Sequence, residues 1–228
     1  ILNFQEEGKK CENWLNKSDL IFTLDFNSYK RIEKLGDVLV KTSAPKVMID
    51  HHQQPDDYAQ FTYSDVTMSS TCEMVYNFID FLEDTSKIDS NIATCLYTGI
   101  MTDTGSFRFQ STTSNTHKII ANLIDKGAQN AQIHNAIYDT NSFNRLQLLG
   151  RALSNLKVLP EYNTAYITLS QEELISFNFE KGDTEGFVNY ALSLERIIFA
   201  AIFIEDQKQK IIKISLRSKG AFSVNAFS

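Results

Sequence analysis

The 228-residue sequence is poor in the residues that mark fibrous, low-complexity and disulfide-rich proteins. It contains 9 Gly, 3 Pro and 3 Cys, which excludes collagen-like and low-complexity chains. No apolar run approaches the roughly 20 residues that a membrane-spanning helix needs, so we expect no membrane association. The first residues show neither Met nor the basic-then-apolar order of a signal peptide.

The few cysteines are widely spaced and form no CxxC pair. Cys11, Cys72 and Cys95 are an odd number, which argues against a disulfide framework and against a zinc site built on thiolates. The pattern fits a reducing cytosol, so we expect a cytoplasmic protein. Cys72 and Cys95 both fall in apolar helical patterns, which predicts two small buried thiols.

An excess of basic residues is also lacking. The chain has 22 Lys and Arg against 28 Asp and Glu, a formal net charge of −6. With 43% hydrophobic and 22% charged residues, the composition is typical of a globular protein. An acidic balance offers no general attraction to a long polyphosphate backbone. If this chain handles nucleic acid, we expect a short piece held in a local site.

Strand-like and helix-like segments alternate in the first part of the chain. Apolar runs that end in an acid predict buried strands at 19–25 and 46–50. A brief strand is predicted at 107–109. The remaining periodic segments predict helices at 28–35, 69–82, 90–101, 115–126, 129–138 and 142–158.

The pattern changes after Pro160. Strands are predicted at 164–169, 197–204 and 210–217, and residues 205–209 predict a hairpin between the last two. The expected fold class is therefore α/β. A parallel-sheet domain with flanking helices should cover 1–155, and a smaller mixed α/β domain should cover 156–228.

Acidic side chains end two of the predicted strands. Asp25 ends the first and Asp50 ends the second, where His51 and His52 follow at once, while Asp103 lies at the end of a predicted helix. Ligands of open α/β sheets bind at the carboxyl ends of strands. Carboxylates with imidazoles and no thiolates suit Mn²⁺ or Mg²⁺, and two such ions can activate water for attack on phosphorus.

Structural explanations compete with this one. A single Asp after a strand, such as Asp25, is most often a turn residue or a helix cap. Asp103 lies in Thr-Asp-Thr-Gly, which is also common turn chemistry. Neighbouring histidines point to opposite sides of an extended chain, so His51 and His52 serve one site only if the strand ends there.

Four motifs in this order resemble the signature of the DHH phosphoesterase superfamily. They are Leu-Asp-Phe-Asn at 24–27, Asp-His-His at 50–52, the capped helix start at 69–75, and Gly-Ile-Met-Thr-Asp-Thr-Gly-Ser-Phe at 99–107. Residues 184–188 and 213–218 resemble the associated DHHA1 substrate domain, which faces the first domain across a cleft. The likeness is closest to the bifunctional oligoribonuclease and phosphoadenosine-phosphate phosphatase group, the nanoRNases, and covers essentially the whole chain.

The resemblance implies roles for the acidic and histidine residues. Asp25 would bridge two Mn²⁺ ions, and His51 and Asp103 would complete the shell of the second ion. Asp50 would orient a histidine, as metal sites commonly require. His52 would face the substrate phosphate or the activated water.

It also implies substrate contacts. Arg217 and Ser218 would reach the substrate's phosphate or its 3′ end from the smaller domain, as a bidentate Arg can. Arg108 would touch a phosphate or stack on a base, although a plain surface Arg explains it equally well.

Two motifs of the superfamily are missing from this sequence. No His followed by Asp-x-Asp precedes Asp25, and no Gly-Gly-Gly-His follows the Arg-Ser strand. Both would lie at the ends, so we expect that the sequence is truncated at both ends and that the fragment alone is impaired.

The resemblance implies a Mn²⁺-dependent phosphoesterase that uses two-metal activation of water. Its substrates would be very short RNA, 3′-phosphoadenosine 5′-phosphate, or both. One alternative is a manganese inorganic pyrophosphatase, which would need a more basic second domain. Another is a non-catalytic module that binds a nucleotide. A homodimer through the helices after Asn115 is also an expectation.

Overall fold

The computed structural model describes residues 2–220, 222 and 224 and divides the chain into two compact units, Ile1–Ile137 and Tyr138–Ser228. The sequence places the boundary at 155 instead. The structural division falls earlier because helix α7 (Phe143–Ser154) packs with the second unit. Its residues Leu148 and Ala152 are fully buried in that unit's core.

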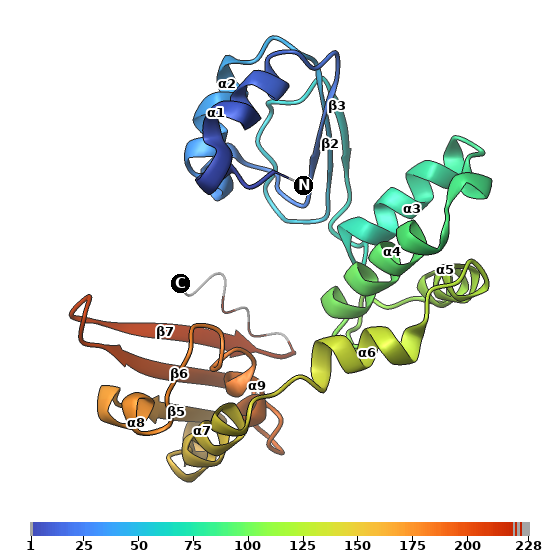
Figure 1. Cartoon of the computed structure of the whole chain (residues 1–228). Coiled ribbons are helices and arrows are strands. Elements are labelled where there is room, and N and C mark those ends of the chain that lie inside the picture. Colours follow the sequence, from blue (N-terminus) through green and yellow to red (C-terminus); the bar gives the residue numbers. More distant parts are fainter. Residues whose placement is uncertain (1, 221, 223, 225–228) are drawn as a thin grey trace. The chain divides into compact units, whose positions relative to one another are not determined.

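The first unit contains a three-stranded parallel sheet in the order β1-β2-β3 (Figure 1). Strands β1 (Ile21–Leu24) and β2 (Lys46–Asp50) confirm the two predicted strands, and β3 (Phe61–Ser64) was not predicted. Leu24 lies opposite Ile49 in the parallel register. The residues that follow β1 and end β2 therefore emerge at the same edge of the sheet, as the sequence predicts.

Helices complete the first unit. Near the sheet are α1 (Phe4–Leu15), the 3₁₀ turn η1 (Tyr29–Ile32) and α2 (Lys34–Lys41); the rest are α3 (Thr71–Phe81), the turn η2 (Thr85–Lys87), α4 (Ser90–Asp103), α5 (Ser114–Asp125) and α6 (Asn130–Tyr138). Helices α3, α4 and α5 pack together around a core that includes Tyr97, Ile100 and Leu123 (Figure 1). This cluster carries the end of α4 to the sheet edge.

The segment after α4 corrects one prediction. Residues 107–109 form turns and not a strand. Gly105, Ser106 and Phe107 have φ angles of 56°, 61° and 65°, so three consecutive residues adopt the left-handed region. A strand requires negative φ, and the Phe-Arg-Phe pattern alone could not reveal the turn.

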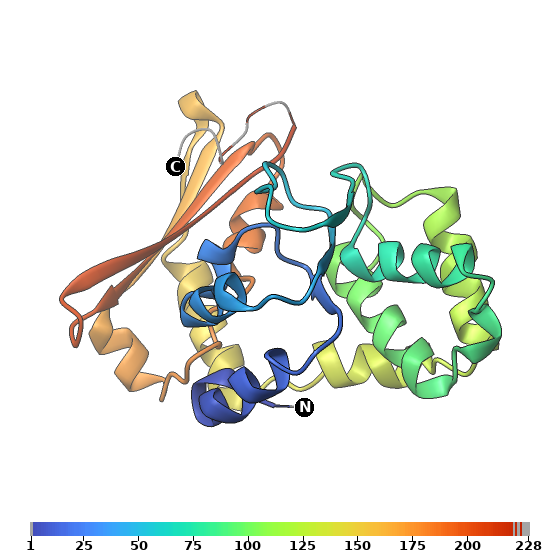
Figure 2. The same cartoon turned by 90° about the horizontal axis from the view of Figure 1, so that it is seen from above.

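The second unit is a four-stranded mixed sheet in the order β4-β5-β6-β7. The strands are β4 (Lys157–Leu159), β5 (Thr164–Leu169), β6 (Phe199–Asp206) and β7 (Ile211–Ser218), with the 3₁₀ turn η3 (Pro160–Tyr162) after β4. Helices α7, α8 (Gln171–Ser176) and α9 (Phe187–Leu192) pack on the sheet (Figure 2). The expected mixed α/β class is confirmed.

The cysteines and the hydrophobic segments give two further results. Cys72 is partly buried, but Cys95 is exposed, so the expectation of a buried thiol at position 95 is wrong. Cys95 lies on the outward side of α4, where a small apolar residue interrupts the polar face. Within the described residues, every helix is too short or too polar to cross a bilayer.

Candidate metal centre

Asp25 directly follows β1 and has a left-handed backbone, with φ of 66°. Aspartate is among the few residues other than glycine that adopt this conformation readily. The Asp25 N–H donates to the Ile49 carbonyl at 3.2 Å, which ties the turn to β2. The Thr71 hydroxyl, at the start of α3, donates to Asp25 Oδ1 at 2.9 Å. The backbone turn and this hydroxyl together fix where the carboxylate points.

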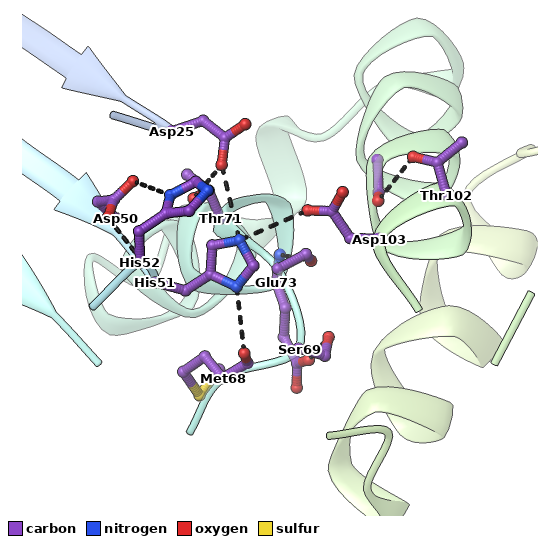
Figure 3. A network of polar contacts seen from close by, with 12 residues as sticks. Asp25, Asp50, His51, His52, Met68, Ser69, Thr71, Glu73, Thr102 and Asp103 are labelled. Atoms are coloured by element: carbon purple, nitrogen blue, oxygen red, sulfur yellow. Dashed lines mark hydrogen bonds and ion pairs between the residues drawn. The ribbon is translucent and has the colours of Figure 1, made fainter. Parts of the chain in front are cut away.

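His51 lies between two carboxylates (Figure 3). Its Nε2 is 3.7 Å from Asp25 Oδ1 and also 3.7 Å from Asp103 Oδ2. Its Nδ1 is 3.3 Å from the carbonyl oxygen of Met68. Because a carbonyl can only accept, this contact assigns the proton of the neutral ring to Nδ1. The lone pair is then on Nε2, which faces both acids.

His52 is oriented by Asp50 at the end of β2. Asp50 is fully buried, and its two oxygens accept from the His52 backbone N–H at 2.7 Å and face His52 Nδ1 at 2.8 Å. A carboxylate on Nδ1 leaves the second ring nitrogen, Nε2, open to a ligand. The chain turns at once after β2, so both histidines reach the same site: their rings are 4.8 Å apart.

Asp103 ends α4 and completes the group. Burial raises the pKa of its carboxyl, the negative charge of Asp25 raises it further, and the two histidines oppose this rise. A nearby negative charge disfavours the ionised form of a carboxyl group, which is why Asp25 adds to the rise at Asp103. The geometry around His51 Nε2 therefore concentrates negative charge at one point of the sheet edge.

The donor atoms fit a divalent cation. Asp25, His51 and His52 can each offer one ligand atom within a 4.8 Å group, and all the donors are oxygen or imidazole nitrogen. Ligands about 2.1 Å from an octahedral ion lie between about 3 Å and about 4.2 Å apart. The two 3.7 Å separations at His51 Nε2 fall in this range, although they are too long for hydrogen bonds.

Supporting residues that the sequence did not reveal surround this group. Asn27 is buried, and its side-chain amide donates to the carbonyls of His52 at 3.0 Å and Gln53 at 2.9 Å. It therefore ties the segment after Asp25 to the segment after His52. Asn27 ends the motif at 24–27, but the motif gives no role to its amide, and a carbonyl such as that of Met68 has no sequence signal at all.

Of the predicted substrate-contacting residues, Arg108 lies in the first unit after α4, and Arg217 and Ser218 lie in the second unit. Arg108 is exposed, and its Nε donates to the Gly105 carbonyl at 2.7 Å. Arg217 and Ser218 lie on β7 in the second unit, opposite Ala200 and Phe199 of β6. Adjacent strand residues point to opposite faces of a sheet, and the contacts of Arg108, Arg217 and Ser218 with a substrate stay a prediction.

Comparison with known proteins identifies a matching family and several relatives. Residues 1–100 match the DHH family, N-terminal domain. The chain therefore carries a DHH-family domain over residues 1–100. A relative from Bacillus subtilis, named as a bifunctional oligoribonuclease and PAP phosphatase, is 27% identical over 96% of this chain and 68% of its own. A probable bifunctional oligoribonuclease and PAP phosphatase of Streptococcus mutans is 31% identical over 76% of this chain and 54% of its own.

A solved structure shares nearly the whole fold. An exopolyphosphatase-related protein from Bacteroides fragilis superposes with a TM-score of 0.96 and 40% sequence identity over 99% of this chain. The matched part is 66% of that protein. The chain thus corresponds to only part of the length of these proteins.

Proposed function

We propose that this DHH protein is a metal-dependent phosphoesterase that hydrolyses short oligoribonucleotides, 3′-phosphoadenosine 5′-phosphate, or both. The observation that carries the proposal is the convergence of Asp25 and Asp103 on Nε2 of His51, whose proton is held on the opposite ring nitrogen. The names of the relatives from Bacillus subtilis and Streptococcus mutans support the substrate class.

Each side chain of the centre has a defined task in this proposal. Asp25, His51 and Asp103 hold the cation, and Asp50 orients His52. When bound, a divalent cation of this kind activates water and offsets the charge of a phosphate group. His52 presents Nε2 beside this position, where it can donate to a phosphate oxygen once the ring is protonated.

Manganese is the cation that we propose, with magnesium as the alternative. Imidazole nitrogen is a better ligand for Mn²⁺ than for Mg²⁺, which prefers an oxygen-only shell and keeps its waters. The side chain of Asp25 is 57% exposed, so its carboxylate would also be accessible to a second cation.

Hydrolysis assays on the natural full-length protein test the proposal. With Mn²⁺ present, we expect turnover of a diribonucleotide or of 3′-phosphoadenosine 5′-phosphate to exceed that of pyrophosphate. Preference for pyrophosphate would favour the pyrophosphatase alternative. Nucleotide binding without any hydrolysis would favour the non-catalytic module.

The Asp25→Asn variant tests the metal centre within the same assay. Asparagine also adopts the left-handed backbone, so we expect a folded protein whose activity falls at least about 100-fold because a charged ligand is lost. Asp84→Asn is the matched control, since Asp84 is an acid that pairs with Lys87 away from the centre. Equal activity of the two variants would rule out the proposed role of Asp25.

A further inference from the structure

Glu73 is a buried acid close to the candidate metal centre but outside it. It lies in the first turn of α3 and is 2% exposed. Its carboxylate accepts from the hydroxyl of Ser69 and, at 3.0 Å, from that of Thr116 on α5. Within the described residues it forms no ion pair, so hydroxyl groups satisfy the carboxylate. Burying a charge costs free energy, which suggests that Glu73 has a role beyond packing.

A carboxylate fixes the direction of these hydrogen bonds. Because it only accepts, the hydroxyl protons of Ser69 and Thr116 must both point toward Glu73. The Thr116 oxygen in turn accepts from the Thr113 N–H at 3.0 Å, so this end of the network is anchored in the cap of α5. Ser69 is thereby held by a partner that is itself fixed.

The constraint on Ser69 reaches His51 through one peptide bond. The Met68 carbonyl and the Ser69 N–H belong to the same planar peptide unit. Met68 O accepts from His51 Nδ1 at 3.3 Å (Figure 3). A rotation of this peptide would remove the acceptor that keeps the His51 proton on Nδ1.

The same segment also reaches Asp25. Ser70 caps α3, with its hydroxyl accepting from the Glu73 N–H at 3.1 Å. Thr71 then donates to Asp25 Oδ1 at 2.9 Å. Residues 68–71 therefore contact two of the proposed metal ligands: the Met68 carbonyl contacts His51, and the Thr71 hydroxyl contacts Asp25. Glu73 in turn hydrogen-bonds to Ser69 and Ser70 of this segment.

We propose that Glu73 is a positioning residue for the metal centre. Through Ser69 it orients the Met68–Ser69 peptide, which holds the proton of His51 on Nδ1 and leaves Nε2 to bind the cation. The inference rests on the proposed metal-dependent function for its purpose, but the contact chain from Glu73 to His51 can be tested without any metal.

The Glu73→Gln variant separates positioning from a purely structural role. Glutamine has nearly the same shape, but only its Oε1 accepts while its Nε2 donates, so the hydroxyls of Ser69 and Thr116 lose one of the two acceptors that fix their direction. Glu173→Gln is the matched control. Glu173 occupies the same place after a helix-capping serine, Ser170, but lies in the second unit.

The first measurement is the tautomer of His51, read by ¹H–¹⁵N correlation in the metal-free protein at about pH 8, where an ordinary histidine is neutral. We expect the Nδ1–H form in the wild type and in Glu173→Gln, and a mixture of tautomers in Glu73→Gln. The second is Mn²⁺ affinity by calorimetry, which we expect Glu73→Gln to lower about tenfold or more.

A folded Glu73→Gln protein with the wild-type His51 tautomer and the Mn²⁺ affinity of Glu173→Gln would overturn the proposal. If Glu73→Gln does not fold, Ser69→Ala decides in its place, since it removes one hydroxyl and leaves the contact between Glu73 and Thr116. An unchanged His51 tautomer in Ser69→Ala would then overturn the proposal. A protein without hydrolytic activity would refute the proposed function, while the tautomer still reports on Glu73.

Discussion

Among the single residues of the centre, Asp50 shows how a buried group controls an exposed one. It is fully buried, yet it accepts from both the backbone and the ring of His52. The Asp50→Asn variant retains the shape but offers only one acceptor oxygen, so one of the two donors loses its partner. We expect the protein to fold and kcat/KM to fall about 10- to 100-fold, the usual cost of removing such a partner. Wild-type kcat/KM would show that the Asp50 carboxylate does not orient the ring.

Cys72 provides a second prediction at the residue scale. Burial, with smaller contributions from the charges of Asp103 and Asp25, raises the pKa of its thiol to about 11. Only the thiolate reacts with alkylating reagents. At pH 8 we therefore expect iodoacetamide to label the exposed Cys95 well before Cys72, as mass spectrometry of timed samples would show.

The same pKa has a consequence for stability. The thiol has a pKa near 9 when unperturbed and about 11 in the folded protein. The unfolded chain therefore loses this proton first, and the contribution to folding is full below about pH 9 and is lost as the pH rises toward 11. Labelling of Cys72 as fast as that of Cys95 at pH 8 would contradict the raised pKa.

Which residues of the centre can be predicted from the sequence depends on the kind of chemical group that each one contributes. Asp25, Asp50 and His51 could be predicted as one group because two apolar runs end in an acid, and the carboxyl ends of parallel strands meet at one edge of a sheet. The carbonyl of Met68 and the amide of Asn27 could not. Their roles depend on which segments meet at the sheet edge, and a carbonyl is present in every residue.

At the scale of elements, the packing of α3 on α4 depends on a glycine. A Cβ on Gly99 would lie 2.1 Å from the Cys72 sulfur and 3.0 Å from its Cβ. We expect Gly99→Ala to lower the free energy of unfolding by about 1–3 kcal/mol, because the overlap outweighs the gain in helix propensity. Urea unfolding followed by circular dichroism measures the change.

Gly150 on α7 is the control, since a Cβ there has nothing within 4 Å. We expect Gly150→Ala to raise the free energy of unfolding by up to about 1 kcal/mol. Replacing Cys72 by Ala in the Gly99→Ala protein should recover part of the loss. A stabilising effect of Gly99→Ala would show that α3 and α4 do not meet as closely as described.

The elements that the sequence predicts well are those with a complete local pattern. The strand at 46–50 and the strand at 164–169 have the predicted bounds, because each is an apolar run between turn signals. Strand β3 is a four-residue edge strand whose Phe61 is 60% exposed. It has no buried run to detect, and it exists because β2 offers a parallel partner.

At the scale of the whole molecule, each unit has its own core. The core of the second unit begins with Leu148 on α7, whereas the core around α3, α4 and α5 ends with Ile133 on α6. The sequence could not reveal this division, since the helical pattern at 142–158 looks the same whichever core it joins. Only the packing partners of Leu148 decide the matter.

Insertion of a specific protease site tests the division. One site is inserted after Asp139, in the exposed connection between α6 and α7. We expect cleavage there to leave both units folded, with little change in their unfolding temperatures. After Asn155, cleavage would separate α7 from its own sheet, and we expect the unfolding temperature of the second unit to fall. Thermal circular dichroism before and after cleavage measures the unfolding temperatures of both proteins. A larger loss of stability after cleavage at Asp139 than after cleavage at Asn155 would support a boundary at 155.

The left-handed turn at Asp25 limits which amino acids evolution can place there. Asparagine and glycine satisfy the backbone but carry no charge, while glutamate keeps the charge but is disfavoured in this conformation. Aspartate alone meets both demands. Position 25 can therefore serve as a diagnostic marker among sequences of this fold. We expect a related protein with Asn or Gly there to keep the fold but to lack the activity that we propose.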